Sequence, residues 1–196
     1  MKYWFPIAVS CLCLQGWADA RSELSLRLAE LDHLACDFTQ RIEDARGDLI
    51  EEASGRVRLL PPRFRWEVTQ PYSQLLIAAG GELKLYEPDL AQVTVRPIED
   101  VIEDTPLALL TRGEALLGEE YDVKRLDGGR FSVRPRAGDT LFEEIVLAFG
   151  STGLVGIRIH DHLGQRTVIR LHGFRDASVI QSADFELIVP PGTDVN

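Results

Sequence analysis

The sequence predicts a mainly β protein, an α+β fold with one long antiparallel sheet and two or three helices. From about residue 48 onward, apolar and polar residues alternate in short runs, which is the pattern of half-buried strands. Turns rich in Gly, Pro and Asp separate these runs. Only residues 22–38 and 104–117 repeat their apolar residues at helical spacing.

The N-terminus has the layout of a secretory signal peptide. Lys2 supplies a positive start, "YWFPIAVSCLCL" an apolar core, and "ADA" at 18–20 an A-x-A cleavage site. The core is shorter than the about 20 apolar residues of a spanning helix. We expect residues 1–20 to be cleaved, leaving 21–196 as a single domain. A lipoprotein signal with Cys11 lipidated is the alternative, although the apolar run before that cysteine is very short.

The net charge disfavours some classes of binding partner, and the cysteine content limits disulfide formation. A net charge of −10 disfavours nucleic acid and anionic membranes, because phosphates repel an acidic protein. Beyond residue 20 the only cysteine is Cys36, so no intrachain disulfide is expected. We expect Cys36 to be a small buried residue at a helix end rather than a reactive thiol.

Two helices are expected. In residues 22–38, Leu24, Leu28, Leu31 and Ala35 recur at helical spacing. In residues 104–117, an Asp-Thr-Pro start suits a helix N-terminus, and leucines form an apolar face.

Strands account for most of the remaining chain. In "RFRWEVT" (63–69) three apolar residues point one way and three charged residues the other. "QLLIAA" and "ELKLYE" flank Gly80-Gly81, which signals a tight hairpin. Further strands are expected at "GRVRLL", "QVTVRPI", "YDVKRL", "RFSVRPR", "FEEIVLAF", "LVGIRIH", "RTVIRLHGF" and "DFELIVP". So many strands offer more apolar surface than a few helices bury, so the sheet either closes as a barrel or curves around a cavity. The pattern does not separate a pocket from a filled core.

Motifs for catalysis are sparse. His160 and His162 have a spacing that can bind zinc, but no third ligand is evident nearby, and solvated histidines are the expectation. "GSTGLVG" (150–156) is not a phosphate loop, and no nucleophile elbow is present. The acidic run at 99–104 lacks the glycine and ligand spacing of a calcium loop. We expect no enzyme activity, no cofactor and no metal.

Several segments together resemble one family. "FTQ" (38–40), "PPRFRWEVTQP" (61–71), "GGELKLYEPDLAQVTV" (80–95), "DTPLALL" (104–110) and "FELIVPPGTDV" (185–195) resemble the LolA family of periplasmic lipoprotein carriers. The resemblance implies a single curved antiparallel sheet forming an incomplete β-barrel, capped by a helical lid over a hydrophobic cavity. It further implies a monomeric carrier in the periplasm of a Gram-negative bacterium. Such a carrier takes lipoproteins from an inner-membrane ABC transporter and hands them to an outer-membrane receptor.

The resemblance also implies site residues, assigned here by strand parity. The acyl-chain cavity would be lined by Phe64, Trp66, Val68, Leu75, Ile77, Leu83, Leu85 and Val93. The parity within "LLIAA" is ambiguous, because neighbouring leucines point to opposite faces. The lid would include Leu24, Leu28, Leu31, Thr105, Pro106, Leu107 and Leu110.

One position departs from the family pattern. Many members carry an arginine before the first proline of "PPRFRW", where it bonds to the lid, and Leu60 stands there instead. Leucine cannot donate a hydrogen bond, so Arg58 or Arg63 substitutes or the lid closes by apolar contact. Together with Arg56 and Arg65, these arginines form a basic cluster, either simply solvated or used to dock an acidic partner or the lid.

Three other functions remain open from the sequence. A lipid-anchored outer-membrane receptor of the same fold would require a lipidated N-terminal cysteine. A lipid-sensing regulatory domain of this fold usually has a second domain, for which the chain has no room. A hydrolase would need a nucleophile and base that the sequence does not offer.

Overall fold

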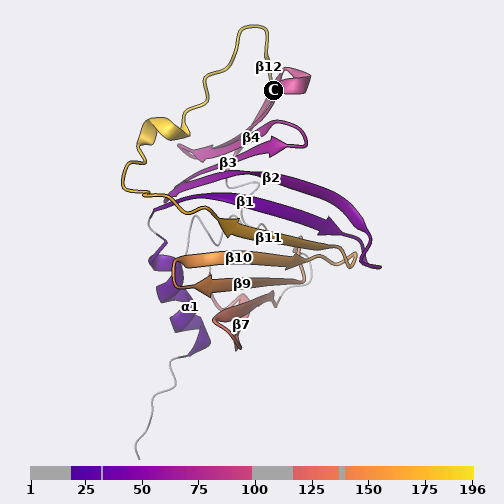
Figure 1. The fold of residues 1–196 in the computed structure, drawn as a ribbon, viewed down its shortest axis with the longest axis vertical. Coiled ribbons are helices and arrows are strands. Elements are labelled where there is room, and N and C mark those ends of the chain that lie inside the picture. Colours follow the sequence, from indigo (N-terminus) through magenta and orange to yellow (C-terminus); the bar gives the residue numbers. More distant parts are fainter. Residues whose placement is uncertain (1–18, 32, 99–116, 137–139) are drawn as a thin grey trace, which may run out of the picture.

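One large sheet dominates the computed structural model, which describes residues 19–31, 33–98, 117–136 and 140–196 (Figure 1). The sheet has 12 strands. They are β1 (Leu34–Glu43), β2 (Leu49–Leu60), β3 (Arg63–Gln70), β4 (Gln74–Ala79), β5 (Glu82–Glu87), β6 (Gln92–Pro97), β7 (Tyr121–Leu126), β8 (Arg130–Pro135), β9 (Glu144–Gly150), β10 (Gly153–His160), β11 (Arg166–His172) and β12 (Asp194–Val195). The described helical elements are α1 (Ala20–Ala29) and the 3-10 turns η1 (Pro88–Leu90) and η3 (Ser182–Phe185).

The strand order leaves the sheet open. It runs β12-β6-β5-β4-β3-β2-β1-β11-β10-β9-β8-β7, so β7 and β12 are the edge strands among the described residues. All neighbouring strands are antiparallel except β12, which pairs parallel with β6. The prediction of a single curved, open sheet is confirmed. The predicted lid helix at 104–117 lies outside the described residues except for Leu117, which is buried.

Hairpin turns fall where the glycines and prolines predict them. Gly80 and Gly81 join β4 to β5, and both have positive φ angles, of 63° and 82°. Such angles cost a residue with a Cβ but not glycine. Pro61 and Pro62 likewise separate β2 from β3, because proline has no N–H for the ladder.

The two faces of the sheet bury different side chains. The side that carries Phe38, Trp66 and Leu147, here called the inner face, belongs to the main core together with the leucines of α1. The opposite side, the outer face, holds a smaller cluster around Ile77, Ile180 and Phe185. Because successive side chains of a strand alternate between faces, most strands contribute to both.

A glycine on β2 permits the tightest packing of the inner face. Gly55 pairs with Phe38 on one side and Val68 on the other. A Cβ on Gly55 would lie 2.8 Å from the Phe38 ring and 1.9 Å from the carbonyl oxygen of Glu67. The Phe38 ring stacks on Trp66 with ring centroids 3.8 Å apart. Gly55 therefore provides the space for an aromatic pair that links β1 to β3.

The first helix is shorter than the sequence predicts. The prediction of a helix over 22–38 is wrong beyond Ala29, because β1 begins at Leu34. Leu34, Cys36 and Phe38 are buried on alternate positions, as in a strand. Cys36 therefore lies within β1 and not at a helix end. The four-residue spacing of Leu34 and Phe38 fits both a helix and a strand, so pairing with β2 and β11 decides the outcome.

Polar contacts hold α1 at the β7 edge of the sheet. The Arg21 guanidinium donates hydrogen bonds to the carbonyl oxygens of Leu117, Gly118 and Tyr121, the last at 2.6 Å. An ion pair of 2.8 Å joins Glu23 of α1 to Arg125 of β7. No helix among the described residues is both long and apolar enough to cross a membrane.

The C-terminal segment (residues 173–196) covers part of the outer face. After β11 it crosses the sheet and reaches β12 at the far edge (Figure 1). Ile180 and Phe185 pack against Ile77 of β4. A strand at "DFELIVP" (184–190) is not formed, since η3 and an irregular stretch occupy those residues. Side-chain packing rather than strand pairing holds this stretch.

Candidate functional site

Five of the eight residues predicted to line a cavity share the inner face. Phe64, Trp66 and Val68 alternate along β3, and Leu83 and Leu85 along β5. Phe64 and Leu83 are buried, whereas the other three are half-buried. β4 lies between these strands and completes a continuous apolar surface.

The assignment of Leu75, Ile77 and Val93 to that surface is wrong. In the β3–β4 register Trp66 lies opposite Leu76, so Leu75 and Ile77 point to the outer face, where they belong to the Phe185 cluster. Val93 pairs with Tyr86 on β5, one position out of phase with Leu85. Residues directly opposite each other in a ladder share a face, which fixes the assignment.

Leu76 is the main residue that the strand-parity assignment missed. It pairs with Trp66 on one side and Leu85 on the other, in the middle of the apolar surface. The tight Gly80-Gly81 turn already contains this information. A two-residue turn pairs Ala79 with Glu82, and counting back along both strands then pairs Leu76 with Leu85.

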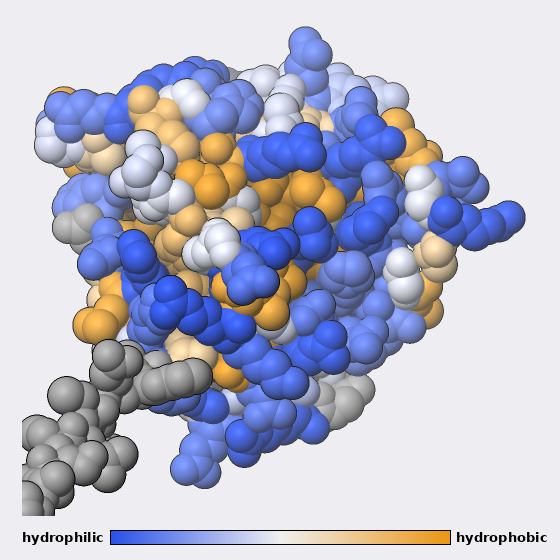
Figure 2. Space-filling model, turned by 60° about the horizontal axis from the view of Figure 1, so that its bottom comes forward, coloured by the Kyte–Doolittle hydropathy of each residue, from blue (hydrophilic) through white to orange (hydrophobic). Residues whose placement is uncertain are grey.

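An open groove of about 1030 Å³ lies on this part of the inner face, here called the inner groove. On the sheet it is lined by the half-buried Trp66, Val68, Leu76 and Leu85 and by the buried Ala53 of β2. It is also lined by Ile50 of β2, Tyr72 and Leu90, large apolar side chains that are 56%, 73% and 66% exposed. Isolated exposed apolar residues are common, but a group around one groove marks a binding surface. Figure 2 shows apolar side chains gathered between hydrophilic ones on one face of the molecule.

Acidic side chains also line the inner groove. They are Glu51 from β2, Glu87 from β5 and Asp89 from η1, while Glu52 of β2, which also lines the groove, pairs with Arg41 on the outer face. Glu87 accepts a long hydrogen bond, 3.5 Å, from the Gln74 amide. The groove thus combines an apolar floor with acidic groups, an arrangement that suits an apolar chain bearing a neutral or cationic head.

The leucines predicted for the lid lie partly outside the described residues. Leu24, Leu28 and Leu31 are buried in the main core with the inner-face residues of β7–β10. Thr105, Pro106, Leu107 and Leu110 belong to the stretch 99–116, which the structure does not describe. The assignment of α1 and that stretch as a lid remains a prediction.

Two of the three residues predicted as a latch contact the C-terminal segment. Arg58 forms an ion pair of 2.9 Å with Asp184, and Arg65 donates a 3.3 Å hydrogen bond to the Asp184 carbonyl oxygen. Leu60 packs on the outer-face cluster that includes Phe185. Arg63 is half-buried beside the Pro61-Pro62 turn and makes no ion pair with the described residues. The predicted lid helix belongs to the stretch 99–116, which the structure does not describe, so a contact between these side chains and that helix remains a prediction.

The cysteine and the two histidines considered as reactive groups lie in surroundings that do not activate them. Burial raises the pKa of the Cys36 thiol to about 12, with a further increase from Asp37, so the thiol stays protonated at neutral pH. His160 ends β10, and His162 is exposed in the following turn. Among the described residues, no group of three or more His, Cys, Asp or Glu side chains is positioned to hold a metal ion.

Comparison with known proteins gives consistent matches along the chain. Residues 29–187 match the family described as "Outer membrane lipoprotein carrier protein LolA". An outer-membrane lipoprotein carrier protein from Chromohalobacter salexigens is 35% identical over 188 residues, covering 94% of this chain and 90% of that protein.

Solved structures share the fold at low sequence identity. An uncharacterized conserved protein from Thermus thermophilus aligns with a TM-score of 0.57 at 15% identity, covering 91% of this chain and 99% of that one. A LolA superfamily protein from Nitrosomonas europaea aligns with a TM-score of 0.50 at 11% identity, covering 87% and 99%. At such identities the likeness establishes the fold alone.

Proposed function

Because the chain belongs to the LolA family of outer-membrane lipoprotein carriers, we propose that it is a periplasmic carrier that holds lipoprotein acyl chains in the inner groove. The observation that carries this proposal is an open apolar groove of about 1030 Å³ on the inner face of an incomplete barrel. The carrier makes and breaks no covalent bond. Its work is to bind a chain and release it.

The free energy of hydration explains why such a carrier is needed. Each methylene of a lipid anchor contributes about 0.8 kcal/mol when buried, so exposing a chain of about fifteen methylenes costs about 12 kcal/mol. A lipoprotein therefore cannot cross an aqueous compartment unless a protein surface replaces the membrane. Since the groove must also give up its cargo, burial there has to be incomplete, which an open groove provides.

The acyl chain would lie along β3, β4 and β5. We assign Trp66, Val68, Leu76 and Leu85 as the contact surface, since they line the groove and are half-buried. The buried Phe64 and Leu83 lie on the same face of these strands. They would become accessible if the predicted lid moves.

Membership of the family supports the following pathway as a proposal. Residues 1–20 would direct export and be removed, and residues 21–196 would act in the periplasm. Cargo would be received from an inner-membrane ABC transporter and delivered to an outer-membrane lipoprotein receptor. The acidic side chains of the inner groove would favour cationic docking surfaces on these partners.

Release of lipoprotein from membranes tests the proposal. Inner-membrane vesicles that contain lipoprotein and the transporter are incubated with ATP and the purified protein, and soluble lipoprotein is measured after sedimentation. We expect release with the parent protein and with Lys84→Gln, and at least tenfold less with Leu85→Gln. The two residues are neighbours on β5, but only Leu85 lines the inner groove. No release by the parent protein in the presence of an active transporter would refute the carrier role.

A further inference from the structure

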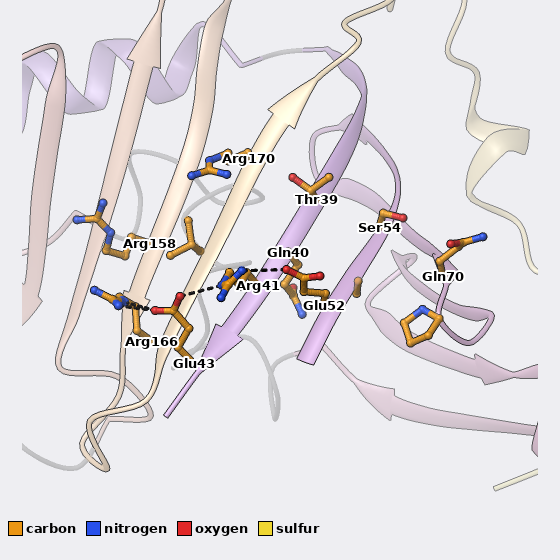
Figure 3. Close-up of a pocket in the computed structure, with 13 residues that line it drawn as sticks. Thr39, Gln40, Arg41, Glu43, Glu52, Ser54, Gln70, Arg158, Arg166 and Arg170 are labelled. Carbon is orange, nitrogen blue, oxygen red and sulfur yellow. Dashed lines mark hydrogen bonds and ion pairs between the residues drawn. The ribbon is translucent and has the colours of Figure 1, made fainter. Parts of the chain in front are cut away.

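A second groove lies on the outer face, on the side of the sheet away from the inner groove. It extends over β2, β1, β11 and β10 with a volume of about 620 Å³ (Figure 3). A hollow of about 500 Å³ over β8–β11 shares four of its residues, Thr39, Arg158, Val168 and Arg170. The two form one continuous surface, here called the outer groove.

Arginines dominate the outer groove even though the chain has a net charge of −10. Arg41 and Arg166 are paired with carboxylates, Arg41 with Glu43 and Glu52 and Arg166 with Glu43 (Figure 3). Arg130, at the β8 side, donates to the carbonyl oxygen of Asp127.

Arg158 and Arg170 differ from their neighbours. Both are exposed, and neither forms an ion pair with a carboxylate in the part of the chain that the structure describes. These two arginines thus lie together in the stretch of the groove common to both hollows. An unpaired guanidinium offers five N–H donors arranged for a carboxylate or phosphate.

The spacing of these two arginines defines the ligand that they fit. In the β10–β11 register Arg170 lies opposite Gly156 and Arg158 opposite Val168, so the two side chains are diagonal neighbours on one face. Diagonal neighbours are about 7–8 Å apart in an antiparallel pair. In an extended peptide, side chains two positions apart lie on one side at about 6.6 Å. Two acidic residues separated by one other residue therefore match the two guanidinium groups.

The floor of the outer groove supports a peptide rather than a lone ion. Val146 and Ala148 of β9 and Val168 of β11 line it beside Arg158, and each is buried or half-buried. Apolar contact beside fixed charges is typical of peptide-binding surfaces.

An anionic membrane is the less favourable occupant. A bilayer meets the whole protein and is repelled by its net charge of −10, whereas a short segment meets only charges within a Debye length of about 8–10 Å. Glu43 and Glu52 also line the groove and would face the phosphates. A segment with two acidic side chains can direct both toward Arg158 and Arg170.

We propose that the outer groove is a docking site for an extended segment of a partner protein that carries two acidic residues separated by one residue. Arg158 and Arg170 bind the two carboxylates, and Val146 and Val168 contact apolar side chains beside them. Arg158 and Arg170 point to the outer face, whereas Trp66 and Leu76 of the inner groove point to the inner face, although Gln40, Glu52, Ala53 and Pro71 line both grooves.

Fluorescence anisotropy with a short labelled peptide tests the proposal. The peptide contains two glutamates separated by one valine, and the control peptide has glutamine in place of both glutamates. We expect the parent to bind the glutamate peptide at least tenfold more tightly than the control and to lose affinity as salt rises. The double variant Arg158→Gln/Arg170→Gln should bind it about tenfold more weakly, within the limit of about 25-fold set by two exposed ion pairs of up to about fivefold each.

Matched controls separate the outcomes. Arg96→Gln removes an exposed arginine on β6, away from the groove, and should bind the peptide like the parent. Because Arg158 and Arg170 are exposed, the double variant should keep the parent's melting temperature. Equal binding by parent and double variant, or no binding by either, would overturn the proposal. Arginine-dependent binding to phosphatidylglycerol vesicles without peptide binding would also overturn it and assign the groove to a membrane.

Discussion

Two neighbouring leucines on β4 allow a direct test of the inner groove as the acyl-chain site. Leu76 lines the groove opposite Trp66, whereas Leu75 points to the outer face and packs near Phe185. Both are half-buried, so they differ mainly in which face they serve. Replacing each in turn with asparagine, which has a similar shape, puts the same polar group on opposite sides of one strand.

The expected magnitude follows from burial. Full burial of a leucine contributes about 1.5–3 kcal/mol, so covering the exposed half of Leu76 with an acyl chain contributes about 1 kcal/mol. An asparagine there loses that contribution and also leaves its amide without water under the chain, at a cost of at least about 1 kcal/mol. The sum, about 2 kcal/mol, weakens binding about 30-fold, since 1.4 kcal/mol corresponds to a tenfold change. Leu75→Asn should change affinity less than about twofold and instead lower the stability of the outer-face cluster.

The mature protein carries its own reporter for this measurement. Trp4 and Trp17 precede the expected cleavage site, which leaves Trp66 as the single tryptophan. Titration with a brominated fatty acid should quench Trp66, because the acyl chain would lie against it. The dissociation constants of parent, Leu76→Asn and Leu75→Asn then come from one assay, with thermal unfolding recorded for each. Equal affinities for the two variants, or a larger loss with Leu75→Asn, would refute the assignment of faces or of the site.

Three further predictions concern the packing of the sheet. Gly55→Ala should lower the free energy of unfolding by about 2 kcal/mol, because the added Cβ would overlap the Glu67 carbonyl oxygen and the Phe38 ring. Thermal denaturation measures this change, and a melting temperature equal to that of the parent would contradict it. The Cys36 thiol, whose pKa burial raises to about 12, should resist iodoacetamide at pH 8 in the folded protein and react once urea unfolds it; rapid labelling without urea would contradict its burial. Burial opposes a lower pKa for Glu144, but hydrogen bonds from Ser132 and Arg134 outweigh it, so the folded pKa lies below 4.5. The parent should therefore be more stable than Glu144→Gln at pH 7 and lose that advantage as the pH falls below about 4.5 through the folded pKa, as urea titrations would measure.

Local pattern was sufficient to predict most strands of this fold. Turn residues such as Gly80-Gly81 and Pro61-Pro62 separate runs whose alternation is clear, and each of these strands formed. The error at residues 34–38 arose where apolar spacing satisfied both a helix and a strand. Only the partners β2 and β11, distant in sequence, decided between them.

The inner groove was predicted less well, for a specific reason. In "LLIAA" five apolar residues follow one another, so alternation does not assign faces to β4. The run is apolar on both sides because the C-terminal segment covers its outer face with Ile180 and Phe185. That cover comes from about a hundred residues further along the chain, and no local pattern indicates it. Leu75 and Ile77 therefore resemble cavity residues in the sequence while serving the opposite face.

The two segments that pack on the sheet, α1 and the C-terminal segment, explain where the two proposed sites lie. α1 packs on the inner face near β7–β10, and the C-terminal segment packs on the outer face near β2–β4. Among the described residues, this leaves an inner surface near β3–β5 and an outer surface near β9–β11, which are the two grooves. One groove is apolar with acidic groups, and the other has paired and unpaired arginines on an apolar floor. Arg158 and Arg170 lie on the face opposite Trp66 and Leu76, so an acidic partner segment bound to these arginines would lie away from the acyl-chain contact surface.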